Sequence, residues 1–228
     1  MKFFAALLDL LFPPKCPFCG QVEDHVGICP NCEKALPWTE ETYVCRTLSG
    51  GLRCAAPLWY EDLTREGLLR FKFQGASAAA EPLGALIAQC AAEQFSGEFD
   101  TVTWVPVSRK RLRKRGYDQS ELLARAACRL WDTEPERLLE KTADNPAQSG
   151  IRDAAARRAN VLGVYRPCPG AEITGKRILL VDDICTTGAT LTECARVLKD
   201  AGAAEVVCAA VAHTREEKTG KDRRKDEN

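Results

Sequence analysis

The chain has 228 residues, and its 32 basic and 32 acidic side chains give a formal net charge of zero. A chain of this length can hold one full domain and a smaller second one. Because the net charge is zero, no general field draws the protein to nucleic acid or to a membrane, and any such attraction has to be local.

The segment that precedes Pro13 is predicted to form an amphipathic helix. Asp9 interrupts its apolar run, the segment is too short to span a bilayer, and no small-residue cleavage site follows it. We therefore expect no membrane span and no signal peptide. The favoured interpretation is a helix packed on the protein's own core, and the alternative is an interfacial or partner-binding helix.

Two C-x-x-C pairs, nine residues apart, form a cysteine block near the N-terminus. Their four thiolates suit a tetrahedral site that leaves no open position, which predicts structural zinc, with an iron–sulfur cluster as the alternative. His25 lies between the pairs and could replace a ligand, although an exposed loop position is favoured. The predicted ligands are Cys16, Cys19, Cys29 and Cys32.

Cys45 and Cys54 are single residues at no metal-ligand spacing and are interpreted as structural thiols. Other cysteines lie in apolar or helical contexts and are interpreted as ordinary buried thiols: Cys128, Cys185, Cys194 and Cys208. Because the twelve cysteines are not arranged as a disulfide framework, we expect a reducing compartment and a cytoplasmic location.

From Leu58 onward, strand and helix patterns alternate, which indicates an α/β fold with a mostly parallel sheet. We expect an N-terminal helix and zinc-ribbon-like module at 1–57, a main domain at 58–214 and a charged disordered tail at 215–228. The predicted helices cover 66–73, 82–95, 120–131 and 153–160, the predicted strands cover 101–107, 138–142 and 205–212, and a polar loop covers 144–149.

A basic run follows the predicted strand at 101–107. Ligands of open α/β sheets bind beyond the carboxyl ends of the strands, and arginine side chains suit a pyrophosphate group. The alternatives are a solvated basic face and a nucleic-acid patch. The predicted ligand contacts of this segment are Ser108, Arg109, Lys110 and Arg113.

The most informative segment is 176–200, where a short apolar strand ends in Asp182 and Asp183 and a hydroxyl-rich turn leads into a helix. Free N–H groups and the helix dipole at such a turn hold a phosphate. A neighbouring acidic pair suits a ligand with hydroxyl groups or Mg²⁺ beside its phosphate. A receiver domain also opens with such a pair, but only about thirty residues follow it here before the polar tail. A turn without any ligand is the other alternative.

The run Val-Asp-Asp-Ile-Cys-Thr-Thr-Gly-Ala-Thr resembles the ribose-phosphate signature of type I phosphoribosyltransferases, which have a Rossmann-like fold. The resemblance implies that Asp182 and Asp183 hold the ribose hydroxyls of phosphoribosyl pyrophosphate, bound with Mg²⁺. It also implies that the 5-phosphate is held by Cys185, Thr186, Thr187, Gly188, Ala189 and Thr190.

Over nearly its whole length the chain resembles the ComF family, which is linked to natural competence and DNA uptake. The resemblance rests on the cysteine block, Lys72-Phe73, Arg-Gly-Tyr-Asp-Gln at 115–119, Gln148-Ser-Gly with Arg157 and Asn160, and the signature. It implies transfer of a phosphoribosyl group to an acceptor that the sequence does not identify. The alternative is a non-catalytic adaptor that senses phosphoribosyl pyrophosphate, or a protein of the competence machinery that binds single-stranded DNA.

Two positions depart from that family's pattern. Asp118 stands where members usually have Asn, which puts an amide contact at that position in question. Cys45 and Cys54 stand where many members carry further paired cysteines.

Overall fold

The computed structural model describes residues 13–39, 43–143 and 161–215. The predicted N-terminal helix, the loop at 144–149, the polar helix at 153–160 and the tail beyond residue 215 lie outside these ranges. None of the helices in the described ranges is long and apolar enough to cross a bilayer.

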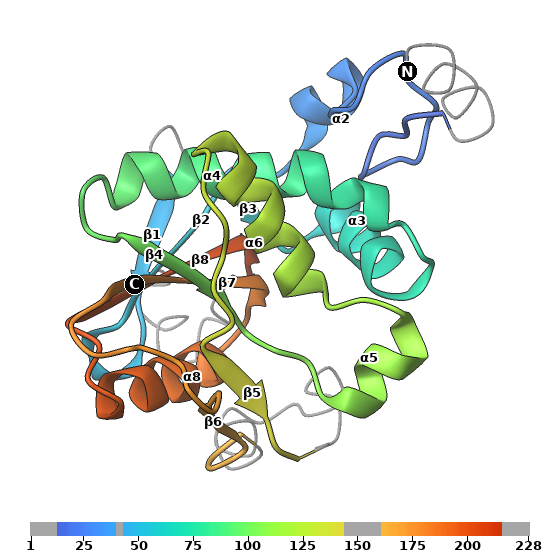
Figure 1. The fold of residues 1–228 in the computed structure, drawn as a ribbon. Coiled ribbons are helices and arrows are strands. Elements are labelled where there is room, and N and C mark those ends of the chain that lie inside the picture. The colour runs from blue at the N-terminus through green and yellow to red at the C-terminus, as the bar shows by residue number, and fades with distance from the viewer. Residues whose placement is uncertain (1–12, 40–42, 144–160, 216–228) are drawn as a thin grey trace, which may run out of the picture.

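The main sheet is mostly parallel, as the sequence predicts (Figure 1). Its central strand β8 lies between β2 and β7, β4 follows β7, and β3 also pairs with β8. The hairpin partner β1 runs antiparallel to β2, and all other pairs are parallel. The strands are β1 (Val44–Thr47), β2 (Arg53–Ala56), β3 (Leu58–Trp59), β4 (Thr101–Trp104), β7 (Arg177–Cys185) and β8 (Glu205–His213).

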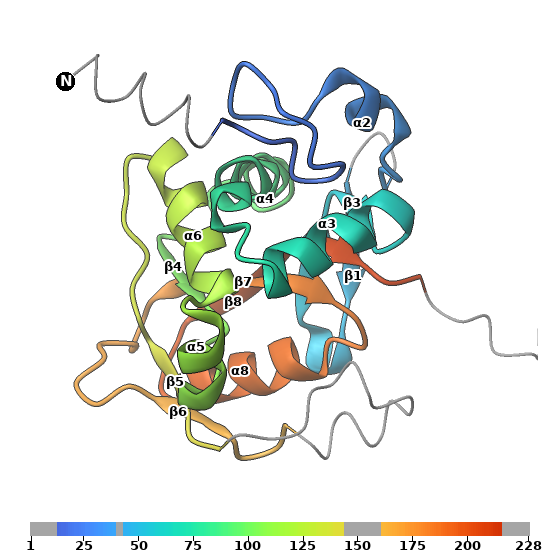
Figure 2. The ribbon, with the colours of Figure 1, turned by 90° about the vertical axis from the view of Figure 1, so that its right-hand side faces the viewer.

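Helices cover both faces of this sheet (Figures 1 and 2). Along β7, Leu179 and Val181 enter one core while Ile178 and Leu180 enter the other, because successive side chains of a strand point to opposite faces. The first core is covered by α3 (Asp62–Phe73), α4 (Ala80–Gln94) and α6 (Gln119–Leu130), and the second by α8 (Ala189–Asp200).

The basic run is a helix, α5 (Arg109–Arg115), which the sequence analysis did not predict. Six of its seven residues are basic, so like charges oppose helix formation, but both ends are capped. The Ser108 hydroxyl accepts a hydrogen bond from the Arg111 N–H (3.3 Å), and Gly116 ends the helix in the left-handed conformation.

The predicted strand at 138–142 is present as β5 (Leu139–Lys141), but it does not join the main sheet. It pairs antiparallel with β6 (Tyr165–Pro167) in a separate ribbon. The short 3-10 helices are η1 (Ser49–Gly51) and η2 (Ser77–Ala79).

The N-terminal module contains the cysteine pairs and α2 (Pro30–Ala35), and it packs on α3. Phe18 is fully buried, and a Cβ atom at Gly67 of α3 would lie 2.8 Å from the Pro17 carbonyl oxygen. Only a residue without a side chain permits this approach. The domain boundary at residue 57 stays a prediction; strands β1 and β2, which precede it, extend the main sheet.

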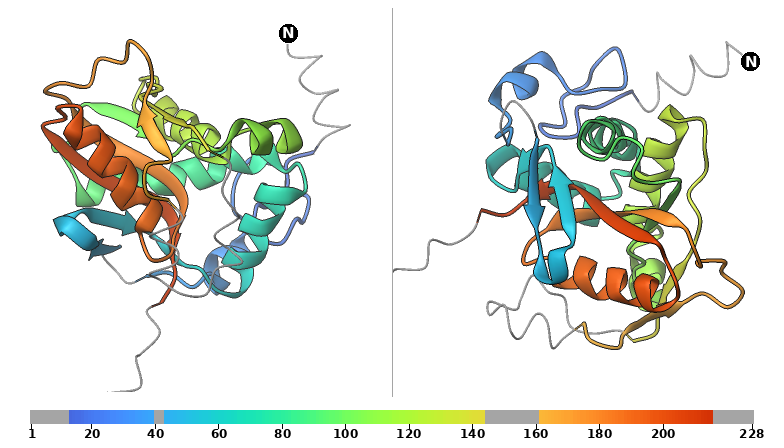
Figure 3. Two further views of the ribbon diagram at one scale, coloured as in Figure 1. Left: turned by 90° about the horizontal axis from the view of Figure 1, so that it is seen from below. Right: turned by 90° about the vertical axis from the view of Figure 1, so that its left-hand side faces the viewer.

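The β1–β2 hairpin reaches the start of α8, as the right-hand view of Figure 3 shows. A Cβ atom at Gly188 would lie 2.6 Å from the Leu48 side chain at the tip of this hairpin. Segments from opposite ends of the chain therefore meet at the turn after β7.

Candidate functional site

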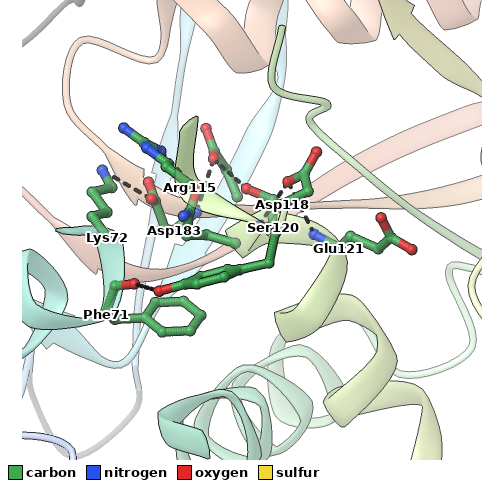
Figure 4. A network of polar contacts seen from close by, with 10 residues as sticks. Phe71, Lys72, Arg115, Asp118, Ser120, Glu121 and Asp183 are labelled. Atoms are coloured by element: carbon green, nitrogen blue, oxygen red, sulfur yellow. Dashed lines mark hydrogen bonds and ion pairs between the residues drawn. The ribbon is translucent and has the colours of Figure 1, made fainter. Parts of the chain in front are cut away.

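The acidic pair lies at the carboxyl end of β7 inside a network of polar contacts (Figure 4). The Ser120 hydroxyl donates to Asp182 Oδ1 (3.0 Å), and the Asp183 N–H donates to the same oxygen (2.8 Å). Burial, followed by the neighbouring charge of Asp183, raises the pKa of Asp182. The site therefore favours a ligand that brings hydroxyl donors or positive charge to this carboxylate.

Lys72, in the last turn of α3, pairs with Asp183 across 2.8 Å between Nζ and Oδ2. Its helix is held in place by the Tyr117 hydroxyl, which donates to the Phe71 carbonyl. The Phe71 and Tyr117 rings also pack, with centroids 6.1 Å apart. These contacts hold the end of α3 from which Lys72 reaches the acidic pair.

The turn after β7 has the geometry of an anion site. Gly188 is the N-cap of α8 with φ of 72°, and the Ala189 N–H donates to the Thr187 hydroxyl (3.4 Å). The helix that follows has 12 residues, so its first N–H groups and its dipole favour an anion at this end. The buried Cys185 ends β7 and opens this turn.

The acidic pair and the turn share one cavity of about 490 Å³. Basic side chains from three elements line it: Arg65 and Lys72 of α3, Arg111 and Arg115 of α5, and Lys141 of β5. Gln119 also lines the cavity and is 1% exposed, and its amide Nε2 has no hydrogen-bond partner. A buried donor without a partner is costly, so this amide is suited to a ligand oxygen.

The predicted contacts Ser108, Arg109, Lys110 and Arg113 line a second cavity of about 460 Å³. This cavity lies between α5 and the β5–β6 ribbon, and Lys141 borders both cavities. The structure thus groups these four residues with Glu140 and Arg166 rather than with Asp183. Their role in ligand binding stays a prediction.

Sequence reasoning missed Arg111, Arg115 and Gln119 as lining residues of the first cavity. If the basic run is treated as a helix, its side chains divide between two faces, because residues four positions apart share a face. Arg111 and Arg115 form one such pair, while Arg109 and Arg113 form another. The family motif at 115–119 marked Gln119, but nothing in the sequence assigned its amide to ligand binding.

Asp118 is the N-cap of α6, and it accepts backbone hydrogen bonds on both carboxylate oxygens. The Ser120 N–H donates to Oδ1 (3.1 Å), and the Val107 N–H donates to Oδ2 (2.9 Å). Burial raises the pKa of this carboxyl group to about 6. The side chain thus orients the start of α6, which presents Gln119 and Ser120 to the first cavity.

The four sulfur atoms of the N-terminal cysteine pairs lie within 4.8 Å of one another. The Cys19 and Cys29 sulfurs are 3.7 Å apart, which is the spacing expected around a zinc ion with Zn–S bonds of about 2.3 Å. Backbone N–H groups of Gln21 and Cys32 point at two of the sulfurs. These donors fit a structural zinc ion, whereas the exposed His25 contacts Asp24 and is outside the cluster.

Two family descriptions match separate parts of the chain. Residues 7–65 match the double zinc ribbon domain, and residues 142–228 match the phosphoribosyl transferase domain. The first match includes the four clustered cysteines, and the second includes the acidic pair and the anion turn.

Relatives resemble the chain over most of its length. DNA utilization protein YhgH of Escherichia coli O157:H7 is 30% identical over 84% of this chain and 80% of its own length. Competence protein ComFC of Streptococcus pneumoniae is 29% identical over 84% of each chain. ComFC of Bacillus subtilis is 24% identical over 84% of this chain and 74% of its own length. The chain therefore belongs to the ComF family of competence-associated proteins, which combine a phosphoribosyltransferase fold with an N-terminal zinc ribbon.

Proposed function

We propose that this protein binds phosphoribosyl pyrophosphate together with Mg²⁺ and transfers the phosphoribosyl group to an acceptor in the handling of DNA during competence. One observation carries the proposal: a single cavity joins an acidic pair, a helix N-terminus and five basic side chains. A sugar phosphate with a second charged group uses all three: the helix N-terminus binds its phosphate, the acidic pair binds its hydroxyls, and the basic side chains bind the second charged group.

Each part of the cavity matches one part of the proposed ligand. The turn from Thr186 to Thr190 would hold the 5-phosphate, and Asp182 and Asp183 would accept hydrogen bonds from the ribose hydroxyls. Arg111 and Arg115 would contact the pyrophosphate, for which a guanidinium group is well suited. The unsatisfied amide of Gln119 adds one further donor toward ligand oxygens.

The acidic pair also suits the reaction itself. Loss of pyrophosphate leaves positive charge on the ribose, and nearby carboxylates stabilise it. Mg²⁺, when bound with the pyrophosphate, would neutralise the leaving group. Lys72 would have to share Asp183 with the ribose, so ligand binding should lengthen the contact between them.

The second cavity supports an alternative role as an adaptor that binds single-stranded DNA. Its lining includes Arg109, Lys110, Arg113, Lys141 and Arg166, and one acidic residue, Glu140. Such a surface could contact phosphates, although it lacks the aromatic side chains on which single strands stack.

Calorimetric titration with phosphoribosyl pyrophosphate and Mg²⁺ tests the binding step. A screen for pyrophosphate release over candidate acceptors then separates an enzyme from an adaptor. We expect saturable binding with one ligand per chain. Absence of binding at millimolar ligand would overturn the proposal, and binding without any release would favour the adaptor.

A further inference from the structure

Apart from the N-terminal thiols, one more group of metal-ligating side chains occurs among the described residues. It consists of Cys54 on β2, Cys185 on β7 and His213 on β8. The two sulfurs and a ring nitrogen of His213 all lie within 4.8 Å of one another. The side chains are 0 to 1% exposed, so bulk water does not fill the space between them.

The imidazole of His213 is oriented as a metal ligand would be. Its Nε2 lies 3.1 Å from the Cys54 carbonyl oxygen, and a carbonyl can only accept, so the proton is on Nε2. The other nitrogen, Nδ1, is then a lone-pair acceptor, and it is buried without a hydrogen-bond partner. Metal-bound histidines commonly have this arrangement, in which the second N–H donates to a carbonyl group.

The charges of the three donors also suit a divalent cation. Two thiolates and a neutral imidazole carry a charge of −2, so Zn²⁺ would give a neutral group that can be buried at low cost.

We infer that Cys54, Cys185 and His213 form a second Zn²⁺ site, separate from the N-terminal cysteine block. Three protein donors leave one coordination position for a small ligand. Cys185 is also the first residue of the anion turn and borders the first cavity. A cation at this site would tie that turn to β2 and β8, so it would support the shape of the proposed phosphate site.

Metal analysis of the full chain, reconstituted with Zn²⁺ under reducing conditions and then dialysed, tests the inference. We expect two zinc ions per chain in the wild type. Cys54→Ser and His213→Asn should each retain one zinc ion, at the N-terminal cysteines. The double variant Cys16→Ser, Cys19→Ser should also retain one, at the second site. Cys208→Ala is the matched control, because Cys208 is a buried thiol on β8 outside the cluster, and it should retain two.

The wild-type stoichiometry is decisive even if a core variant fails to fold. One zinc per wild-type chain overturns the inference, as does a folded His213→Asn variant that still holds two. Cobalt substitution gives an independent readout, because the spectrum of the cobalt form should lose one component in His213→Asn and none in Cys208→Ala.

Discussion

The two cavities beside helix α5 have similar volumes and similar basic linings, but they differ in what surrounds the charge. The first combines Arg111 and Arg115 with an acidic pair and a helix N-terminus. The second combines Arg109 and Arg113 with a single carboxylate, Glu140, and the helix start that lines it belongs to the short, basic helix α5. Positive charge alone attracts any anion, whereas the surrounding groups select one. The comparison therefore predicts selectivity in the first cavity only.

The largest expected effect comes from removing the basic side chains of one face of α5, with removal of those of the other face as the matched control. Arg111→Ala with Arg115→Ala should weaken binding of phosphoribosyl pyrophosphate roughly 100-fold or more, since each charge-assisted hydrogen bond contributes about 1.5–3 kcal/mol. Arg109→Ala with Arg113→Ala removes the same charge and should change affinity less than about threefold. Calorimetry measures both. Equal losses in the two double variants would refute the assignment of the faces.

Acidic side chains provide a second pair of matched variants. Asp183→Asn removes a carboxylate from the first cavity and should lower affinity roughly 10- to 100-fold. Glu140→Gln removes one from the second and should have little effect. The ligand-induced increase in melting temperature reports both changes. If Asp183→Asn keeps the full increase while remaining folded, the ribose is not held at the acidic pair.

A third comparison concerns stability rather than affinity, through Asp118, which orients residues that belong only to the first cavity. Its folded-state pKa of about 6 exceeds the ordinary value of 3.8, so the folded protein holds this proton more tightly. The resulting stability is fully present below about pH 4 and is lost as the pH rises through about 6. As the pH rises over this range, the free energy of unfolding of the wild type should therefore fall by roughly 3 kcal/mol relative to that of Asp118→Asn. Denaturant unfolding between pH 4 and 7 measures the difference, and a constant difference would contradict the prediction.

The smallest effect tests whether the zinc module supports the first cavity. Gly67→Val would force the Pro17 backbone away from α3 and should cost about 1–3 kcal/mol of stability. Because α3 carries Lys72, binding of phosphoribosyl pyrophosphate should weaken as well. Glu66→Val, at an exposed position of the same helix, is the control and should leave affinity unchanged. Identical affinities in the two variants would show that the module does not support the cavity.

The acidic pair, the anion turn and the cysteine block could be predicted because each is a short segment with its own chemistry. Asp182, Asp183 and Gly188 lie within seven residues, and the strand and helix around them have clear periodicity. The mostly parallel sheet was predicted for the same reason, since its strands alternate with amphipathic helices.

Features that depend on distant contacts were not predicted. The helix in the basic run was missed for a different reason: it has no apolar periodicity, and only its local caps, Ser108 and Gly116, indicate it. The strand at β5 was found, but its partner could not be, since a strand pattern does not encode its neighbour. Cys54, Cys185 and His213 are separated by 131 and 28 residues, so their grouping exists only in the folded sheet.

Strand β8 is the last strand of the described chain, yet it is the central strand of the sheet. Its neighbours β2 and β7 come from opposite ends of the sequence, and neither can complete its backbone hydrogen bonds until β8 has been synthesised. Pairing of β2 and β7 with β8 must therefore follow translation of residue 213, and the edges of β2 and β7 that face β8 stay open until then. Folding is expected to be slow and to require the nascent chain to be protected from aggregation, and truncation before Glu205 should give insoluble protein.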